Sequence, residues 1–103
     1  MLWDKTKYVL KIHGGKGQFT TGDMHGLIQH IAVIPESSDT VWSIKVFDSD
    51  NDIIYERHDM LGRLDDKDGL PVGQSKPERL RIMFYELTKN ENITVTFKVR
   101  EIR

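Results

Sequence analysis

The segment 93–99 alternates strictly between apolar and polar side chains, and this alternation constrains the fold more than any other feature. Ile93, Val95, Phe97 and Val99 lie on one side of an extended chain, and threonine and lysine residues lie on the other. A strand of this kind packs one face on a core and exposes the other to water, as in antiparallel sheets. Because the helical period of about 3.6 residues hardly occurs in the chain, the sequence predicts an all-β fold.

Other segments show the same alternation or a short apolar run, and polar or glycine-rich stretches separate them. We predict further strands at residues 8–12, 27–34, 41–47, 53–57 and 80–87, with a short one at 70–72. Two hairpins are expected, one around the acidic turn 48–52 and one joining 80–87 to the C-terminal strand through 88–92. We expect a turn at 19–26 and a long charged loop at 61–77. Together these elements predict a single antiparallel β-sandwich of about six to eight strands.

The chain of 103 residues has the size of one domain, and no linker divides it. We expect residues 8–103 to form that domain and residues 1–7 to be an N-terminal arm. The sequence contains no cysteine, which excludes disulfides, thiolate catalysis and cysteine-ligated zinc. It shows neither a signal-peptide-like apolar region nor a membrane-spanning stretch, so we expect no secretion and no membrane partner.

Charge is nearly balanced, with 15 lysine and arginine residues against 16 aspartate and glutamate residues. Acidic and basic residues alternate in short groups, as in 65–68 and 76–79. Nucleic-acid-binding proteins normally carry a basic run or a basic face. From this distribution along the chain we expect no nucleic-acid partner.

Motifs for catalysis or metal binding are weak. The turn 48–52 places three carboxylates at alternate positions, which could suit calcium. However, Ile53 occupies the place of the EF-hand glycine and Asp59 that of its glutamate, so a plain hairpin turn is favoured. The segment 14–17 lacks the hydroxyl residue that follows the lysine of a phosphate-binding loop, which favours a β-turn.

The four histidines are too scattered to predict a metal site, and no serine stands in a nucleophile elbow. A pair of carboxylates acting as a glycosidase is disfavoured for a domain of this size. We therefore expect a non-enzymatic protein without cofactor or metal.

Large apolar side chains outside the predicted core indicate an interface. Met1, Leu2 and Trp3 belong to the expected arm, and Met83 and Tyr85 lie on the non-core face of strand 80–87. We predict that these five residues bind a partner. In the alternative, Trp3 folds back over the edge of the sandwich, and Met83 and Tyr85 face the second sheet.

The run Gly17-Gln18-Phe19-Thr20-Thr21-Gly22-Asp23-Met24-His25-Gly26-Leu27-Ile28, followed by a strand that ends at Ile34-Pro35, resembles small structural proteins of tailed bacteriophage particles. The longer, more charged loop at 61–77 departs from that family.

The resemblance implies a virion protein, assembled in the host cytoplasm, that decorates or cements the capsid. Its partners would be major capsid protein subunits or other virion proteins, in a symmetric or homo-oligomeric arrangement. Alternatives are a neck or tail component, a soluble carbohydrate- or ligand-binding β-sandwich, and a small hydrolase.

Overall fold

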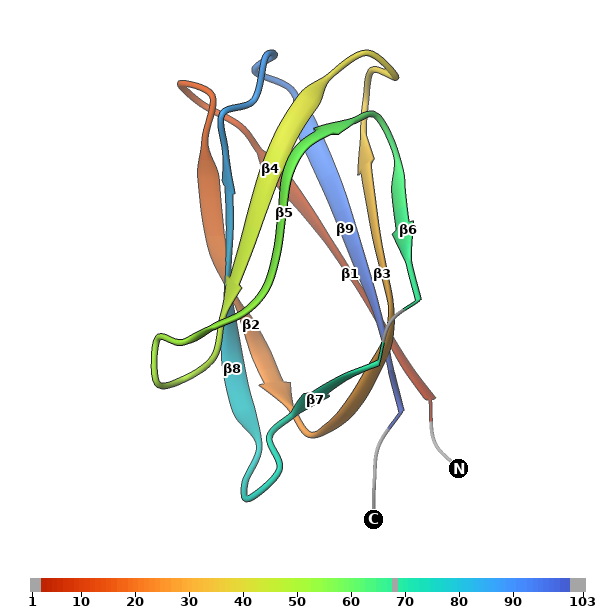
Figure 1. Cartoon of the computed structure of the whole chain (residues 1–103), viewed down its shortest axis with the longest axis vertical. Helices are drawn as coiled ribbons and strands as arrows, with labels where there is room; N and C mark the ends of the chain where they lie inside the picture. Colours follow the sequence, from red (N-terminus) through yellow and green to blue (C-terminus); the bar gives the residue numbers. More distant parts are fainter. Residues whose placement is uncertain (1–2, 68, 101–103) are drawn as a thin grey trace.

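Two antiparallel sheets lie face to face in the computed structural model, which describes residues 3–67 and 69–100 (Figure 1). The strands in these residues are β1 (Trp3–Lys11), β2 (Gly17–Met24), β3 (Gly26–Pro35), β4 (Val41–Phe47), β5 (Ile53–Leu61), β6 (Leu64–Asp66), β7 (Leu70–Val72), β8 (Glu78–Tyr85) and β9 (Asn92–Arg100). One sheet has the order β1-β9-β3-β6, with β7 also paired to β3, and the other has the order β2-β8-β4-β5. The predicted antiparallel β-sandwich is confirmed.

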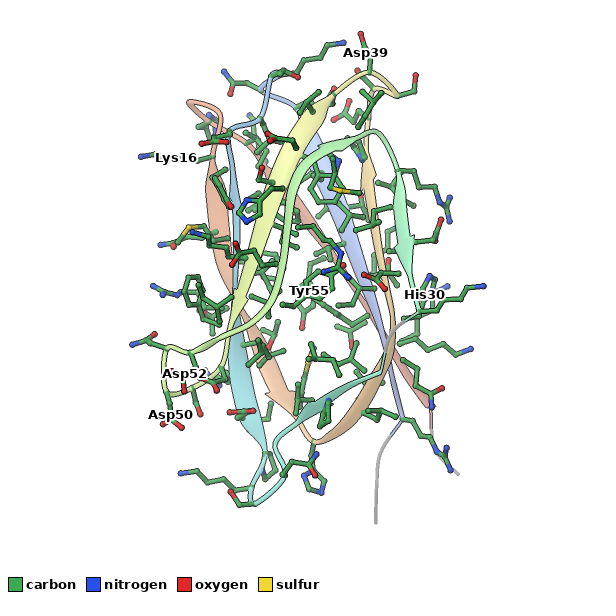
Figure 2. The ribbon with its side chains drawn as sticks, viewed as in Figure 1. Lys16, His30, Asp39, Asp50, Asp52 and Tyr55 are labelled. Atoms are coloured by element: carbon green, nitrogen blue, oxygen red, sulfur yellow. The ribbon has the colours of Figure 1, made fainter. Side chains whose placement is uncertain are left out.

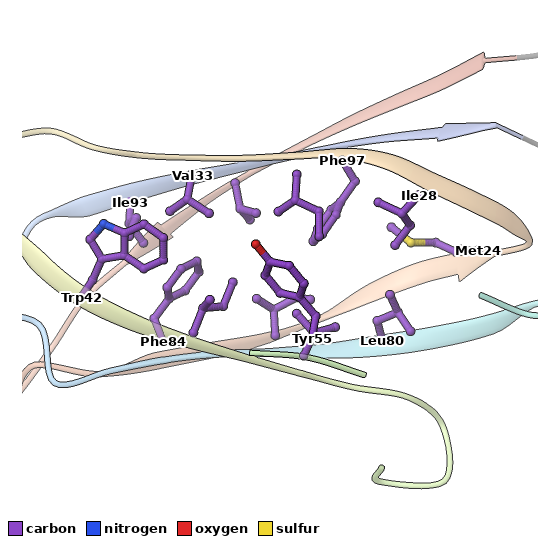
Figure 3. Packing of buried hydrophobic residues seen from close by; sticks show 14 of the residues in the cluster. Met24, Ile28, Val33, Trp42, Tyr55, Leu80, Phe84, Ile93 and Phe97 are labelled. Atoms are coloured by element: carbon purple, nitrogen blue, oxygen red, sulfur yellow. The ribbon is translucent and has the colours of Figure 1, made fainter. Parts of the chain in front are cut away.

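The core lies between the sheets and is built from the apolar side of each strand. Trp42, Phe84 and Phe97 are fully buried there, and the rings of Trp42 and Phe84 meet edge to face with centroids 6.0 Å apart (Figure 3). The indole nitrogen of Trp42 donates to the carbonyl of Gly62 at 2.7 Å, so its one polar atom is satisfied. The alternation predicted for β8 and β9 is confirmed, because their apolar residues line this core.

The predicted hairpin between β8 and β9 is wrong. β8 pairs with β2 and β4, whereas β9 pairs with β1 and β3, so the two strands belong to opposite sheets. Each strand buries its apolar face by meeting the other across the core, which a hairpin within one sheet would not achieve. The connection between them closes the end of the sandwich, where buried Leu87 donates its backbone N–H to Gly15 at 2.9 Å.

The turn predicted at 19–26 is strand β2 for most of its length. Thr21 points into the core in phase with Phe19, and a bulge between Thr20 and Asp23 then shifts the alternation so that Met24 is the next buried residue. The hydroxyl of Thr21 accepts the backbone N–H of Leu80 at 3.0 Å and donates to the carbonyl of Gly22 at 2.8 Å. A bulge uses the same small polar residues as a turn, and this similarity misled the prediction.

The first strand also begins earlier than predicted, because residues 3–7 of the expected arm pair with β9 along their whole length. Lysines alternate with half-buried residues in this part of β1, so it lacks the strong apolar alternation on which the prediction relied. Met1 and Leu2 lie outside the described residues. Within the predicted loop at 61–77, β6 and β7 both pair with β3, and β7 matches the short strand expected at 70–72.

Candidate partner-binding surface

The outer face of the four-stranded sheet carries a group of large, half-buried side chains outside the core. Alternation in β8 turns Arg81, Met83 and Tyr85 outward, opposite to the buried Leu80, Ile82 and Phe84. The register brings Phe47 of β4 opposite Arg81, and Lys45 opposite Met83. We call Lys45, Phe47, Arg81, Met83 and Tyr85 the aromatic face.

Cations and rings on the aromatic face stack on one another. The guanidinium carbon of Arg81 lies 4.3 Å from the centroid of the Phe47 ring, and the amine of Lys45 lies 5.1 Å from that of Tyr85. Exposed contacts of this type contribute about 0.5–1 kcal/mol each. They also hold long side chains in place, so less conformational entropy is lost when a partner binds.

A polar chain of Glu56, His58 and Tyr85 fixes the tyrosine. The carboxylate of Glu56 accepts from Nε2 of His58, and Nδ1 of that ring then accepts the Tyr85 hydroxyl at 2.7 Å. Burial, followed by the nearby carboxylates of Glu56, Glu86 and Asp59, raises the pKa of Tyr85. These two hydrogen bonds hold the Tyr85 ring in position on the aromatic face.

A shallow pocket of about 470 Å³ adjoins Met83 and Tyr85. Its lining residues are His13, Lys16, Gly17, Gln18, Met83, Phe84 and Tyr85. Its opposite wall is the turn between β1 and β2, where Gly14 and Gly15 adopt the left-handed φ values of 62° and 73°. A Cβ on Gly15 would lie 3.1 Å from the carbonyl of Leu87, so this turn needs glycine and holds the wall close to β8.

Of the predicted partner-binding residues, those that the structure describes come from both sheets. Met83 and Tyr85 are half-buried on the aromatic face, and the second sheet lies on the other side of their strand. The backbone of Trp3 belongs to β1 in the opposite sheet, opposite Arg100, while Met1 and Leu2 lie outside the described residues. Sequence reasoning missed Phe47 and Arg81, although the alternation of 41–47 and 80–87 already places them away from the core.

The acidic turn between β4 and β5 uses the carboxylate of Asp48 to bind its own backbone. Oδ1 of Asp48 accepts the N–H groups of Asp50 and Asp52, both at 2.9 Å, and Asn51 takes a left-handed φ of 65°. Figure 2 shows Asp50 and Asp52 at the tip of this turn, away from the buried Tyr55. In the part of the chain that the structure describes, no three histidine, cysteine, aspartate or glutamate side chains form a group that could hold a metal ion.

The described residues contain no helix long and apolar enough to cross a membrane.

Comparison with known proteins gives two distant likenesses. No family model matches the chain, and no curated protein matches it. Two solved structures of infectious bursal disease virus align with it at 7% identity, the Gx strain with a TM-score of 0.38 and the Gt strain with 0.35. Each alignment covers 96% of this chain but only 36% of the viral chain. At these TM-scores the likeness carries no argument about function, and the resemblance to phage structural proteins stays a prediction.

Proposed function

We propose that this chain is a non-enzymatic structural protein of a virus particle, which decorates the capsid by binding coat-protein subunits through the aromatic face. The observation that carries the proposal is the chemistry of that face. Tyrosine, phenylalanine, methionine and arginine are the residue types enriched in protein interfaces, and tyrosine and arginine dominate binding hot spots. Phe47, Arg81, Met83 and Tyr85 supply one of each on two adjacent strands.

The rigidity of the face supports a role in permanent attachment. Its side chains project from paired strands, two of them stack on aromatic rings, and the Tyr85 hydroxyl is tied to His58. A preorganised surface loses little entropy on association, which favours stable binding to a coat. The pocket beside Met83 would accept an apolar side chain of the partner, as hot-spot residues commonly insert into such pockets.

The virion setting is supported by the similarity of residues 17–28 to structural proteins of tailed phages. In the structure this segment forms β2 and the start of β3, including the Thr21 bulge. Its β2 part is an edge strand of the sheet that carries the aromatic face, and this part belongs to the scaffold of the proposed interface.

A carbohydrate-binding role is the second candidate, because Tyr85 lines the shallow pocket together with Gln18. Sugars stack on open aromatic faces, but the amine of Lys45 lies over the ring of Tyr85. That contact leaves at most one face of the ring for a sugar and favours the protein partner.

Cosedimentation with purified particles tests the proposal. We expect the wild-type chain to sediment with empty coat-protein shells at a fixed copy number, and Met83→Asp with Tyr85→Ala to reduce the affinity at least about 30-fold, as for loss of a hot spot worth about 2 kcal/mol. The matched control is Thr94→Asp with Thr96→Ala on the opposite outer face, which should sediment like the wild type. Normal sedimentation of the Met83 and Tyr85 variant would reject the aromatic face, and a glycan that binds the chain while shells do not would favour the second candidate.

A further inference from the structure

The strand register gathers basic side chains on the outer face of the other sheet. Lys5 of β1 lies opposite Lys98 of β9, while Lys7 and Lys11 lie opposite Thr96 and Asn92. Residues directly opposite one another in paired strands share a face, and every second residue along a strand points to the same side. Lys5, Lys7 and Lys11 are exposed, so all three amines point into solvent on this side of the sandwich.

The cluster of basic side chains continues from the edge strand β1 onto its neighbour β9, inside the sheet. Its core-facing residues include Phe97 and Val99, so Lys98 and Arg100 point outward beside the lysines of β1. We call Lys5, Lys7, Lys11, Lys98 and Arg100 the basic face.

A hollow beside Lys98 continues this face onto β3 and onto the segment after β6, where Lys67 adds a further cation. A shallow hollow of about 550 Å³ has as its lining residues Leu27, Gln29, His30, Lys67, Gly69 and Lys98. Figure 2 shows His30 at this side of the sandwich.

Few carboxylates balance this surface within the described part of the chain. Asp65 shares the face, and it is held by Nε of Arg63 at 2.5 Å and by His30 at 3.2 Å. Lys5, Lys7 and Lys11 form no ion pair with any described carboxylate. The chain has a formal net charge of −1, yet the charged side chains described on this face are mostly basic.

Protection of a free sheet edge explains only part of the cluster. Lysines on an edge strand prevent unwanted pairing with other chains, and β1 is such a strand. Lys98 and Arg100, however, belong to β9, which has neighbours on both sides and no edge to protect. Their position on the same face indicates a ligand with many negative charges.

We propose that the basic face binds the phosphate backbone of duplex nucleic acid, without reading its sequence. Lysine is depleted in the buried centre of protein interfaces, which argues against a protein partner here. None of the side chains described on this face is aromatic, so the described residues supply cations for phosphates and no ring for stacking unpaired bases. A duplex presents phosphates without requiring such stacking.

The dimensions of the face suit a duplex. Alternate residues of a strand are about 7 Å apart, so Lys5 and Lys11 span about 20 Å. That length corresponds to about six base pairs at roughly 3.4 Å per pair. The proposal does not rest on the virion role, because it uses the opposite sheet and a different ligand.

Fluorescence anisotropy of the full chain with a labelled 30-base-pair duplex tests the proposal. About four phosphate contacts would give a slope near −3.6 in a plot of log K against log salt concentration. The variant Lys5→Gln, Lys7→Gln, Lys98→Gln should bind more than about 30-fold more weakly at 100 mM salt, and its slope should be smaller in magnitude by about 2.7. The matched control, Lys16→Gln, Lys76→Gln, Lys89→Gln, makes the same change in net charge and should bind like the wild type.

Three results would overturn the proposal. These are failure of the wild-type chain to bind the duplex at 50 mM salt, equal weakening by the two triple variants, and preferential binding of heparin or polyglutamate over the duplex. Far-ultraviolet circular dichroism and a thermal melt would verify that each variant is folded, which we expect because the substituted lysines are exposed.

Discussion

The two outer faces of the sandwich are built in the same way from alternating strands, but their side chains differ in kind. Both consist of the outward half of alternating strands, so both share one core. On the aromatic face the outward residues contact each other, as when Arg81 covers Phe47 and Lys45 covers Tyr85. On the basic face the three lysines of β1 extend into solvent without a described ion-pair partner.

This difference indicates two kinds of partner. Side chains that are already fixed on a surface favour a dry, shape-matched contact whose lifetime depends on buried area. Hydrated lysines favour a polyanion, and the affinity then depends on the ions released from it. The two faces should therefore respond differently to mutation, salt and pH.

The largest effect is expected from the core that both faces share. Phe97 is fully buried between the two sheets, and Phe97→Ala should lower the free energy of unfolding by about 3–5 kcal/mol through the cavity it leaves. Chemical denaturation measures this loss, and binding at both faces should fall in parallel with the folded fraction. Gln18→Ala, at an exposed position, should change the stability by less than about 0.5 kcal/mol. Independent loss of one binding activity in the folded Phe97 variant would contradict a shared scaffold.

The next largest effect is expected from salt, because binding at the two faces should depend on salt concentration to different degrees. Raising the salt concentration from 50 to 200 mM should weaken duplex binding about 150-fold if about four phosphates are contacted. Attachment to shells through the aromatic face should change by less than about threefold, because its contacts are largely short-range. Parallel titrations by anisotropy and sedimentation measure both. Equal salt dependence of the two would remove the distinction between the faces.

The core pattern could be predicted from the sequence, but the basic face could not. Alternation places Val95 and Phe97 on the core side of β9, whichever strands pair with it. The prediction of core residues therefore did not depend on strand pairing. The basic face depends on Lys5 and Lys7 lying beside Lys98, residues more than 90 positions apart that are brought together only by the β1–β9 register. Charge that alternates along the chain is thus separated in space.

The site prediction was limited for a related reason. Met83 and Tyr85 could be assigned to the outer side of β8 from their own strand, and they lie there. Their neighbours Phe47 and Lys45 come from β4, and the predicted hairpin between 80–87 and 93–99 gave β8 a wrong partner. Both strands have one apolar face, and that pattern does not distinguish pairing within a sheet from packing across a core.

Two substitutions at Tyr85 would show what the aromatic face contributes. Tyr85→Phe keeps the ring and its contact with Lys45 but loses the hydrogen bond to His58, so we expect about fivefold weaker attachment to shells. Tyr85→Ala should weaken it about 30-fold. Neither substitution should alter duplex binding, and sedimentation with anisotropy on the same samples measures both. If Tyr85→Phe weakened attachment as much as Tyr85→Ala, the hydroxyl and not the ring would be the main contact.

The smallest effect is expected at the end of the sandwich, where Glu91 ties together two connections between the sheets. Its carboxylate accepts the hydroxyls of Thr40 and Ser37, the latter at 2.8 Å, and the backbone N–H of Ser37 at 3.2 Å. The hydrogen bond from the Thr40 hydroxyl is the main cause that lowers the pKa of Glu91, and the hydrogen bonds from Ser37 lower it further.

A carboxylate whose pKa is lower in the folded state stabilises that state above its unfolded pKa. The contribution is lost as the pH falls below about 4 and through the folded pKa. Glu91→Gln should therefore be slightly less stable than the wild type at pH 7, and the difference should shrink as the pH falls from 5 to 2.5. Thermal melts across this range measure it, and Glu86→Gln on the same connection controls for the loss of one carboxylate. Because Glu91 lies where the connections between the two sheets meet, the loss of stability at low pH should affect binding at the two faces equally. A pH-independent difference would show that the hydrogen bonds to Ser37 and Thr40 do not depend on the charge of Glu91.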